Sequence, residues 1–462
     1  MSINGTSTTY GTLMIRRLRE RHGIRMNKEI AVVGGGAAGM TAAISAARAG
    51  AHVTIYERND RVGKKILSTG NGKCNFSNEK MSADCYYGSG AALAGELYKT
   101  VGVAEIKSFF EGLGMRIRDR NGYLYPASEQ AATVLDILRF ELERQAVKIH
   151  TGQQVTDLIR LSDGLSVETA DGRRNRYDAV ILAGGGKAAP KTGSDGAGLL
   201  LAEGLGHRII PTVPALVALR CKEDFYKRVS GVRCQAGLTL RIDGQPVRVE
   251  HGELQWTDYG ISGIPVFQFS REAAYALKER RKVNVDIHMM SAGEDNDSYE
   301  DYKDFWENRW AVQNWQSMDQ FVTGLVNKKI GCLMLKMAGI RETDRAADVP
   351  KTCRRKLEGL FRSFTVEVKG TNSFDQAQVC AGGIDCAEVS RTLESKIVPR
   401  LFFAGEILDI DGICGGYNLQ WAWSSGIAAG QAAADSTHTS LISVCSRGRF
   451  SDDSSSFGCP VK

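Results

Sequence analysis

The chain has 462 residues, of which 43% are hydrophobic and 24% charged, and its formal net charge is +6. This length exceeds the roughly 250–300 residues at which a single hydrophobic core stops growing, so we expect several domains. The composition is that of an ordinary globular protein and excludes a disordered or fibrous class. The charge is modest for a dedicated nucleic-acid binder. The sequence contains no apolar run of about 18 residues, so we predict no membrane span.

Eleven cysteines are scattered along the chain without a Cys-x-x-Cys pair. This spacing predicts neither a metal site nor a vicinal redox dithiol. Reduced thiols fit best, so we expect a cytoplasmic protein. The arginine-rich start lacks the apolar segment of a secretory signal. We expect a disordered extension over residues 1–27, with translation starting upstream of Met26, and a flexible, serine-containing tail over residues 435–462.

The first predicted strand is followed by a glycine-rich turn, an alanine-rich helix and a second strand that ends at Glu57. In the spacing Gly34-x-Gly36-x-x-Gly39, the glycines allow a sharp turn, close approach to a pyrophosphate and close helix–strand packing. The N–H groups at the helix start would attract that anion, and Glu57 would bind a ribose hydroxyl. A glycine-rich turn without a ligand is the alternative. The predicted contacts of this dinucleotide-binding unit are Gly34, Gly36, Ala37, Ala38, Gly39 and Glu57.

A second strand, glycine-rich loop and helix follow one another between residues 401 and 430. This junction suits the ribityl and flavin half of a long cofactor, which favours FAD over NAD. Asp411 would bind a ribityl hydroxyl or lie near the pyrophosphate, and the helix after Asn418 would direct its positive end at flavin N1 and O2. A loop with a helix cap is the alternative. The predicted contacts are Gly405, Glu406, Asp411, Asn418 and Leu419.

Two further segments carry glycines near this predicted site. In the polar loop over residues 63–75, either Lys64 or Lys65 could pair with phosphate or flavin oxygens, and the alternative is a solvated pair of lysines. Residues 184–189 formally match a relaxed dinucleotide fingerprint, but Pro190 follows at once and no acidic strand end comes at the expected distance. We therefore predict no second nucleotide domain, so that a nicotinamide reductant would bind only transiently.

The middle of the chain changes character. Short alternating runs at 215–219, 238–242, 247–249 and 283–287 predict antiparallel strands of a small β-barrel. The expected division is a first FAD-binding segment over 28–212, a barrel domain over 213–290, a helical subdomain over 291–356, a return strand within 357–369, and a second FAD-binding segment over 370–434.

The motifs together resemble one family, the YhiN/BaiN-type flavoproteins or aminoacetone oxidase family FAD-binding enzymes. They span residues 28 to 432 and read GGGAAGMTAAISAARAG, GKKILSTGNGKCN, TGSDGAG, ELQWTDYGISG, TLESK and FFAGEILDIDGICGGYNLQWAWSSGIAAG. The resemblance implies an α/β fold, a glutathione-reductase-like doubly wound FAD-binding domain with an inserted β-barrel and a helical subdomain. It also implies FAD contacts at Ala38, Glu57, Arg58, Lys64, Val155, Asn418 and Leu419.

The BaiN branch implies reduction of the 4,6-dienone system of 3-oxo bile acids. Hydride would pass from reduced flavin to the electron-poor carbon, with NAD(P)H as transient co-substrate, while Tyr259, Tyr417 or Lys64 polarises the ketone or supplies the proton. The alternatives are an amine oxidase acting on aminoacetone and, with less support, a flavoprotein acting on tRNA. We expect a small-molecule substrate and no nucleic-acid partner, and the sequence leaves the oligomeric state open.

Overall fold

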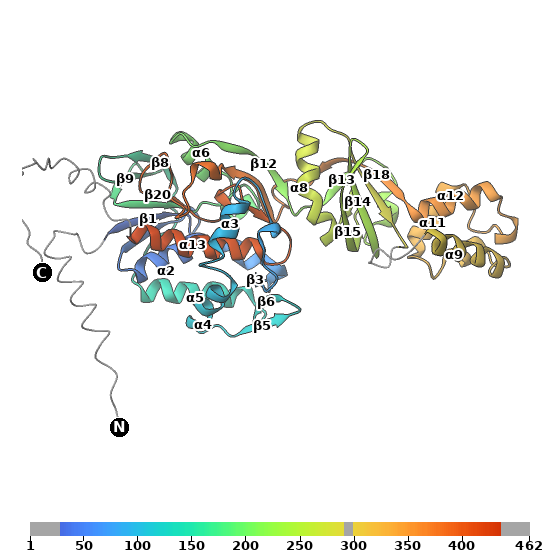
Figure 1. Cartoon of the computed structure of the whole chain (residues 1–462), viewed down its shortest axis with the longest axis horizontal. Helices are drawn as coiled ribbons and strands as arrows, with labels where there is room; N and C mark the ends of the chain where they lie inside the picture. Colours follow the sequence, from blue (N-terminus) through green and yellow to red (C-terminus); the bar gives the residue numbers. More distant parts are fainter. Residues whose placement is uncertain (1–27, 291–298, 436–462) are drawn as a thin grey trace, which may run out of the picture.

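The computed structural model describes residues 28–290 and 299–435. A parallel-sheet lobe lies at one end of an elongated molecule, a barrel in the middle and a group of helices at the other end (Figure 1). The predicted extension over 1–27, the start of the helical subdomain at 291–298 and the tail from 436 onward lie outside the described residues. Within the described part, no helix combines the length and apolar character needed to cross a bilayer.

The lobe is built on a parallel sheet whose strand order is β20-β11-β1-β2-β7. Four of its strands, β1, β2, β11 and β20, are short and mostly buried apolar runs, as expected where helices cover both sides of a sheet, whereas the edge strand β7 is exposed. β20, the last of this sheet's strands in sequence, pairs with β11, so segments from the early and late parts of the described chain share one sheet. The strands are β1 (Glu29–Val33), β2 (His52–Tyr56), β7 (Lys148–His150), β11 (Ala179–Leu182) and β20 (Leu401–Phe403).

Helices α2 (Ala37–Arg48) and α13 (Tyr417–Asp435) pack against each other at very short range. A Cβ on Gly426 would clash with Thr41 and the Ala38 carbonyl, and a Cβ on Gly430 would clash with the Ala42 carbonyl. Only glycine permits this approach. The sequence predicts this second helix from about Leu419 to Gly430, and the structure extends it at both ends.

Smaller elements surround the sheet. The apolar run over residues 177–182, which the sequence predicts as one buried strand, is split at Asp178, whose carboxylate accepts a hydrogen bond from the backbone N–H of Glu29 at 3.0 Å. Its first residue, Tyr177, instead ends a strand of an antiparallel sheet made of β8 (Val155–Arg160), β9 (Leu165–Thr169) and β10 (Arg174–Tyr177). The remaining elements used below are η1 (Lys64–Gly72), β4 (Tyr86–Tyr87), α4 (Val103–Gly112), α6 (Ala197–Gly204), η6 (Gly405–Ile407) and β21 (Asp411–Gly412).

Six strands form a closed barrel in the order β13-β16-β15-β14-β17-β18. Asp243 and Gly244 both have positive φ and connect β14 to β15, as in a two-residue primed turn, whose twist matches that of the strands. Helix α8 (Ile264–Lys278) follows β16 and faces the lobe (Figure 1). The strands are β13 (Leu219–Cys221), β14 (Arg233–Ile242), β15 (Gln245–Trp256), β16 (Gly260–Ser262), β17 (Val283–His288) and β18 (Phe364–Thr371).

The barrel carries α9 (Tyr299–Val312), α10 (Met318–Val322), α11 (Lys328–Ala338) and α12 (Lys351–Arg362). Helix α12 crosses the boundary predicted at 357, because Leu357 and Phe361 continue its buried face at helical spacing. The return strand is β18, which begins at Phe364. The segment predicted as one strand over 215–219 is the link between β12 (Ile209–Ala215) and β13, and Leu216 within it has a positive φ.

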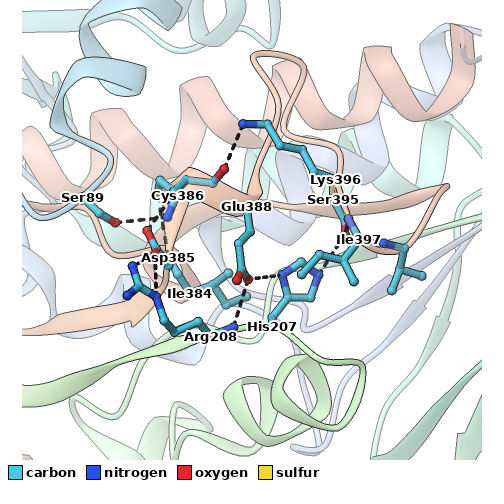
Figure 2. A network of polar contacts seen from close by, with 12 residues as sticks. Ser89, His207, Arg208, Ile384, Asp385, Cys386, Glu388, Ser395, Lys396 and Ile397 are labelled. Carbon is cyan, nitrogen blue, oxygen red and sulfur yellow. Dashed lines mark hydrogen bonds and ion pairs between the residues drawn. The ribbon is translucent and has the colours of Figure 1, made fainter.

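The barrel joins the lobe through the antiparallel pair of β12 and β19 (Val379–Ile384). A polar network at the lobe end of this pair is shown in Figure 2. His207 contacts Glu388 Oε2 through Nδ1 at 3.1 Å and Ser395 Oγ through Nε2 at 2.8 Å. The Ser395 oxygen also accepts hydrogen bonds from the N–H groups of Ile397 and Val398.

This serine–histidine–glutamate chain has the order of a nucleophilic triad, but its surroundings make it structural. The Ser395 oxygen is buried and accepts two backbone hydrogen bonds, so its proton points to the imidazole and no face is open to a substrate. His207 is therefore neutral, with its proton on Nδ1 donated to Glu388. Burial lowers the pKa of His207, although Glu388 acts in the opposite direction.

Gly39→Ala should destabilise the protein by about 1–3 kcal/mol, because the new Cβ would clash with the Gly34 carbonyl. The matched control is Gly112→Ala at the end of α4, where a Cβ meets no atom within 4 Å. That change should be neutral or slightly stabilising. Urea unfolding followed by circular dichroism measures both, and equal midpoints for the two variants would contradict the prediction.

The buried His207 should make stability fall in acid. Its folded-state pKa lies below the unfolded value of about 6.5, so its contribution is complete above that pH and is lost as pH falls through it. The urea midpoint should drop between pH 8 and pH 5.5. His207→Gln should have a lower midpoint at pH 8 but a shallower drop. A drop of the same size in both proteins would count against this role.

Candidate active site

The two predicted glycine-rich junctions meet at the start of α2. A Cβ on Gly405 would lie 2.7 Å from the Cβ of Ala38. Trp421 on α13 donates its indole N–H to the Gly405 carbonyl at 3.0 Å, and Ser425 accepts from the Gly405 N–H at 2.9 Å. The structure thus brings together the two segments whose combination the sequence analysis assigns to one long ligand.

The first glycine loop has the geometry that a pyrophosphate requires. Gly34 has a φ of +103°, and a Cβ there would lie 2.5 Å from the Ala183 carbonyl oxygen. By contrast, a Cβ on Gly36 would meet no atom within 4 Å. Protein packing therefore does not explain glycine at position 36, whereas a phosphate group over this open space does. The first N–H groups of α2, at Ala37, Ala38 and Gly39, have no partner within the helix and fit an anion there.

Glu57 lies at the end of β2 beside this loop and is only 7% exposed. Its Oε2 accepts from the Gly35 N–H at 2.9 Å, and its Oε1 accepts from the N–H and side-chain amide of Asn59, both at 2.8 Å. A carboxylate has about four acceptor positions, so one remains for a ribose hydroxyl. These hydrogen bonds fix the orientation of the Glu57 carboxylate before any ligand binds.

Three other predicted contacts lie around the same edge of the lobe. Arg58 pairs with Asp195, which lines a cleft of about 390 Å³ beside α6. Lys64 pairs with Asp60 at 2.6 Å and so is directed along its own loop. Val155 begins β8, is 6% exposed and lines a second cleft of about 220 Å³.

Lys65, rather than Lys64, reaches the distal segment. Its Nζ lies 2.8 Å from Oε2 of Glu406. The other carboxylate oxygen of Glu406 accepts from the backbone N–H of Cys380 at 2.7 Å. Glu406 therefore connects η1, η6 and β19. The sequence alone could not choose between two adjacent lysines, because the choice depends on which one faces η6.

Asn418 and Asp411 are both engaged within the distal segment. Asn418 accepts from the Gly412 N–H and donates to its carbonyl, both at 2.8 Å, and so closes the loop before α13. Leu419 is half-buried beside it. Asp411 is 2% exposed and lies 3.0 Å from Nε of Arg271 on α8. Burial raises the pKa of Asp411 to about 7 despite this arginine.

The two tyrosines predicted as candidate donors lie in different places. The Tyr417 hydroxyl at the start of α13 donates to the Lys80 carbonyl at 2.9 Å, and burial raises its pKa to about 12. Tyr259 lies in the barrel, where its hydroxyl accepts from the Asn372 side chain at 2.7 Å and its ring lies 4.8 Å from the Arg220 guanidinium. The structure does not bring them together.

Arg271 was missed by sequence analysis. It lies within the inserted part of the chain, and no local motif marks it. Only the contact of α8 with β21 reveals its position beside Asp411. Among the residues that the structure describes, no group of three or more potential ligands is arranged to hold a metal ion.

A family model described as "HI0933-like protein Rossmann domain" matches residues 28–432. The chain is 42% identical over 416 residues to a 3-dehydro-bile acid delta(4,6)-reductase of Clostridium scindens, covering 89% of this chain and 100% of that protein. It is 27% identical over 406 residues to a ribosomal RNA dihydrouridine synthase of Haemophilus influenzae, covering 86% and 96%. A protein of Escherichia coli with the same name is 25% identical over 404 residues, covering 87% and 96%.

These matches extend over both halves of the lobe and the inserted domains. They confirm the family resemblance, the α/β fold class and the assignment to flavin-dependent oxidoreductases that the sequence analysis predicts. They do not test the individual contact residues. With a family model covering most of its length and a relative of this similarity, the chain belongs to the HI0933-like Rossmann-domain family.

Proposed function

We propose that this protein uses FAD to reduce a carbon–carbon double bond conjugated to the 3-ketone of a bile acid or related steroid. The supporting observation is the 42% identity to the C. scindens reductase along that protein's whole length. The names of the more distant relatives support the same reaction type. A dihydrouridine is a uridine whose ring double bond, conjugated to a carbonyl, has gained two hydrogens.

We assign the cofactor contacts as follows. The N-terminus of α2 binds the pyrophosphate, Glu57 binds the adenosine ribose, and Val155 contacts the adenine. The segments around η1, η6 and the N-terminus of α13 hold the ribityl and flavin half. FAD supplies the hydride when bound. The proposed contacts are Gly34, Gly36, Ala37, Ala38, Gly39, Glu57, Arg58, Lys64, Val155, Gly405, Glu406, Asp411, Asn418 and Leu419.

The electron donor is a nicotinamide nucleotide, NADH or NADPH, that binds transiently. The glycine-rich turn at 184–186 follows β11 of the same sheet, and Ala183 packs on Gly34, so this turn is part of the FAD-binding lobe. Since it offers no separate site, nicotinamide and enone would use one face of the flavin in turn. This arrangement predicts ping-pong kinetics.

A second candidate function is reduction of uridine in ribosomal RNA. It is favoured by the similarity to two ribosomal RNA dihydrouridine synthases, since each match extends over 96% of the synthase. Their identities of 25–27% are well below that of the bile acid enzyme, so we rank the steroid substrate first. The aminoacetone oxidase alternative has no comparable observation in its favour.

Purified protein should carry FAD and absorb in the visible. Anaerobic NADH or NADPH should bleach this absorbance, and a 3-oxo-4,6-dienoic bile acid should then restore it in a stopped-flow experiment. A protein that takes up no FAD would overturn the whole proposal. Failure of the dienone, together with dihydrouridine formation in unmodified ribosomal RNA, would select the second candidate. Peroxide release with aminoacetone would select the oxidase.

Lys65→Gln should weaken FAD binding about fivefold, because it leaves the Glu406 carboxylate without its cation next to the predicted flavin site. This corresponds to about 1 kcal/mol, as for a partly exposed ion pair. Lys99→Gln, which removes a solvent-exposed pair with Glu96, should bind FAD normally. Fluorescence titration of the apoprotein with FAD gives both constants. Equal constants would show that the Lys65–Glu406 pair does not support the site.

A further inference from the structure

The contact between α8 and the lobe is rich in charge. Arg271 donates to Asp411 at 3.0 Å, and its guanidinium lies 5.3 Å from the ring centroid of Tyr87 on β4 and 5.0 Å from that of Tyr275. Arg248 on β15 donates to the Tyr87 hydroxyl and pairs with Glu272 at 3.0 Å. Side chains from α8, β15, β4 and β21 therefore form one polar junction between barrel and lobe.

This junction carries more carboxyl groups than cations. Two arginines face four carboxyl groups, and burial with the neighbouring Asp409 and Glu272 raises the pKa of Asp411 to about 7. This environment favours the protonated form of Asp411 more than an exposed position would. The charged and titratable groups at the junction are Tyr87, Arg248, Glu250, Arg271, Glu272, Tyr275, Cys380, Asp409 and Asp411.

Three buried polar atoms at this junction have no hydrogen-bond partner. They are Oε2 of Glu272, the hydroxyl of Tyr275 and Oδ1 of Asp409, and they make up three of the seven such side-chain atoms in the described residues. Buried polar atoms are nearly always paired in folded proteins. Their concentration here indicates unmet hydrogen-bonding capacity that a ligand can satisfy.

Tyr275 differs from the other two because its ordinary neutral form carries a proton to donate. Its ring packs against an apolar cluster, and burial raises its pKa to about 12. The hydroxyl is therefore an unpaired donor in apolar surroundings, which is the character of the few polar groups that orient ligands in small-molecule sites. The apolar cluster consists of Val213, Ala215, Leu216, Ala274, Val379 and Ala381.

The apolar cluster also adjoins the predicted flavin half of the cofactor site. It includes residues on both sides of Cys380, whose backbone N–H donates to Glu406. A Cβ on Gly186, at the end of the glycine-rich turn, would lie 2.6 Å from the Cβ of Cys380. Tyr275 on α8 therefore faces the strand that connects to two of the lobe's glycine-rich segments.

We propose that the Tyr275 hydroxyl protonates the substrate, at the junction of α8 with the lobe. This inference rests on the proposed function, since it assigns the proton donor of that reaction. Bound FAD, once reduced by NAD(P)H, would supply the hydride for a new C–H bond at the electron-poor carbon of the conjugated system. The π electrons shift toward the ketone, and the resulting enolate takes the Tyr275 proton on carbon. Water then reprotonates the phenolate.

This assignment agrees with the state of the two tyrosines that the sequence analysis predicts as donors. The Tyr417 proton is committed to the Lys80 carbonyl. The Tyr259 hydroxyl accepts from the Asn372 side chain and lies in the barrel, away from the contact of α8 with the lobe. The Tyr275 hydroxyl has no protein partner that a substrate would have to displace. A transition-state proton donor contributes typically 10²–10⁴-fold to a rate.

Tyr275→Phe separates this role from a structural one. Anaerobic reoxidation of the reduced enzyme by the dienone should slow about 100-fold, while FAD content and the rate of reduction by NAD(P)H stay at the wild-type level. The urea midpoint should stay equal or rise, because the lost hydroxyl has no hydrogen-bond partner. In D₂O, wild type should place deuterium on one face of the protonated carbon, and the variant on both.

The matched control is Tyr302→Phe on α9, whose hydroxyl donates to the Glu358 carbonyl at the far end of the molecule (Figure 1). It should lower the urea midpoint and leave reoxidation unchanged. Wild-type reoxidation rates in Tyr275→Phe would overturn the assignment of Tyr275 and leave the proposed function intact. If the wild-type enzyme itself is not reoxidised by the dienone, the proposed function fails, and the assignment falls with it.

Discussion

The close packing of α2 against α13 is the constraint on which the rest of the molecule depends. Gly426 and Gly430 let the two helices approach so closely that a Cβ at either position would clash with α2. This contact joins segments that are distant in sequence. Strand β20 then pairs with β11 in the same sheet. As a result, both glycine-rich junctions lie at the start of α2, and the inserted barrel and helices project from a lobe that the two ends of the fold complete.

Short sequence patterns predict those parts of the fold that depend on residues close together in the chain. Gly34, Gly36 and Gly39 could be assigned roles from spacing alone, since each role follows from the strand–turn–helix context. The barrel strands at 238–242 and 283–287 were also predictable from alternation, and they lie within β14 and β17. Element ends were less predictable. The break at Asp178 depends on a hydrogen bond from Glu29, a residue distant in sequence.

Contacts between distant segments explain what the sequence could not predict at the site. Lys65 rather than Lys64 reaches Glu406, and Arg271 reaches Asp411 from an inserted domain. The same contacts show that residues assigned to a ligand also support the protein itself. Glu57 accepts three hydrogen bonds from its own chain, and Asn418 closes the loop before α13. Such groups are fixed before any ligand arrives, which lowers the entropic cost of binding.

The pairing of β12 with β19 has a consequence for how the architecture could arise. Ala215 lies opposite Val379, so the chain leaves the lobe and returns to it at neighbouring positions. Because the two ends of the inserted segment already lie side by side, closing it as a loop costs little entropy. This entropic cost of loop closure grows only slowly with the length of the insertion. Barrel and helices can therefore be exchanged, enlarged or removed in evolution as one cassette, while the nucleotide-binding scaffold keeps its own connectivity.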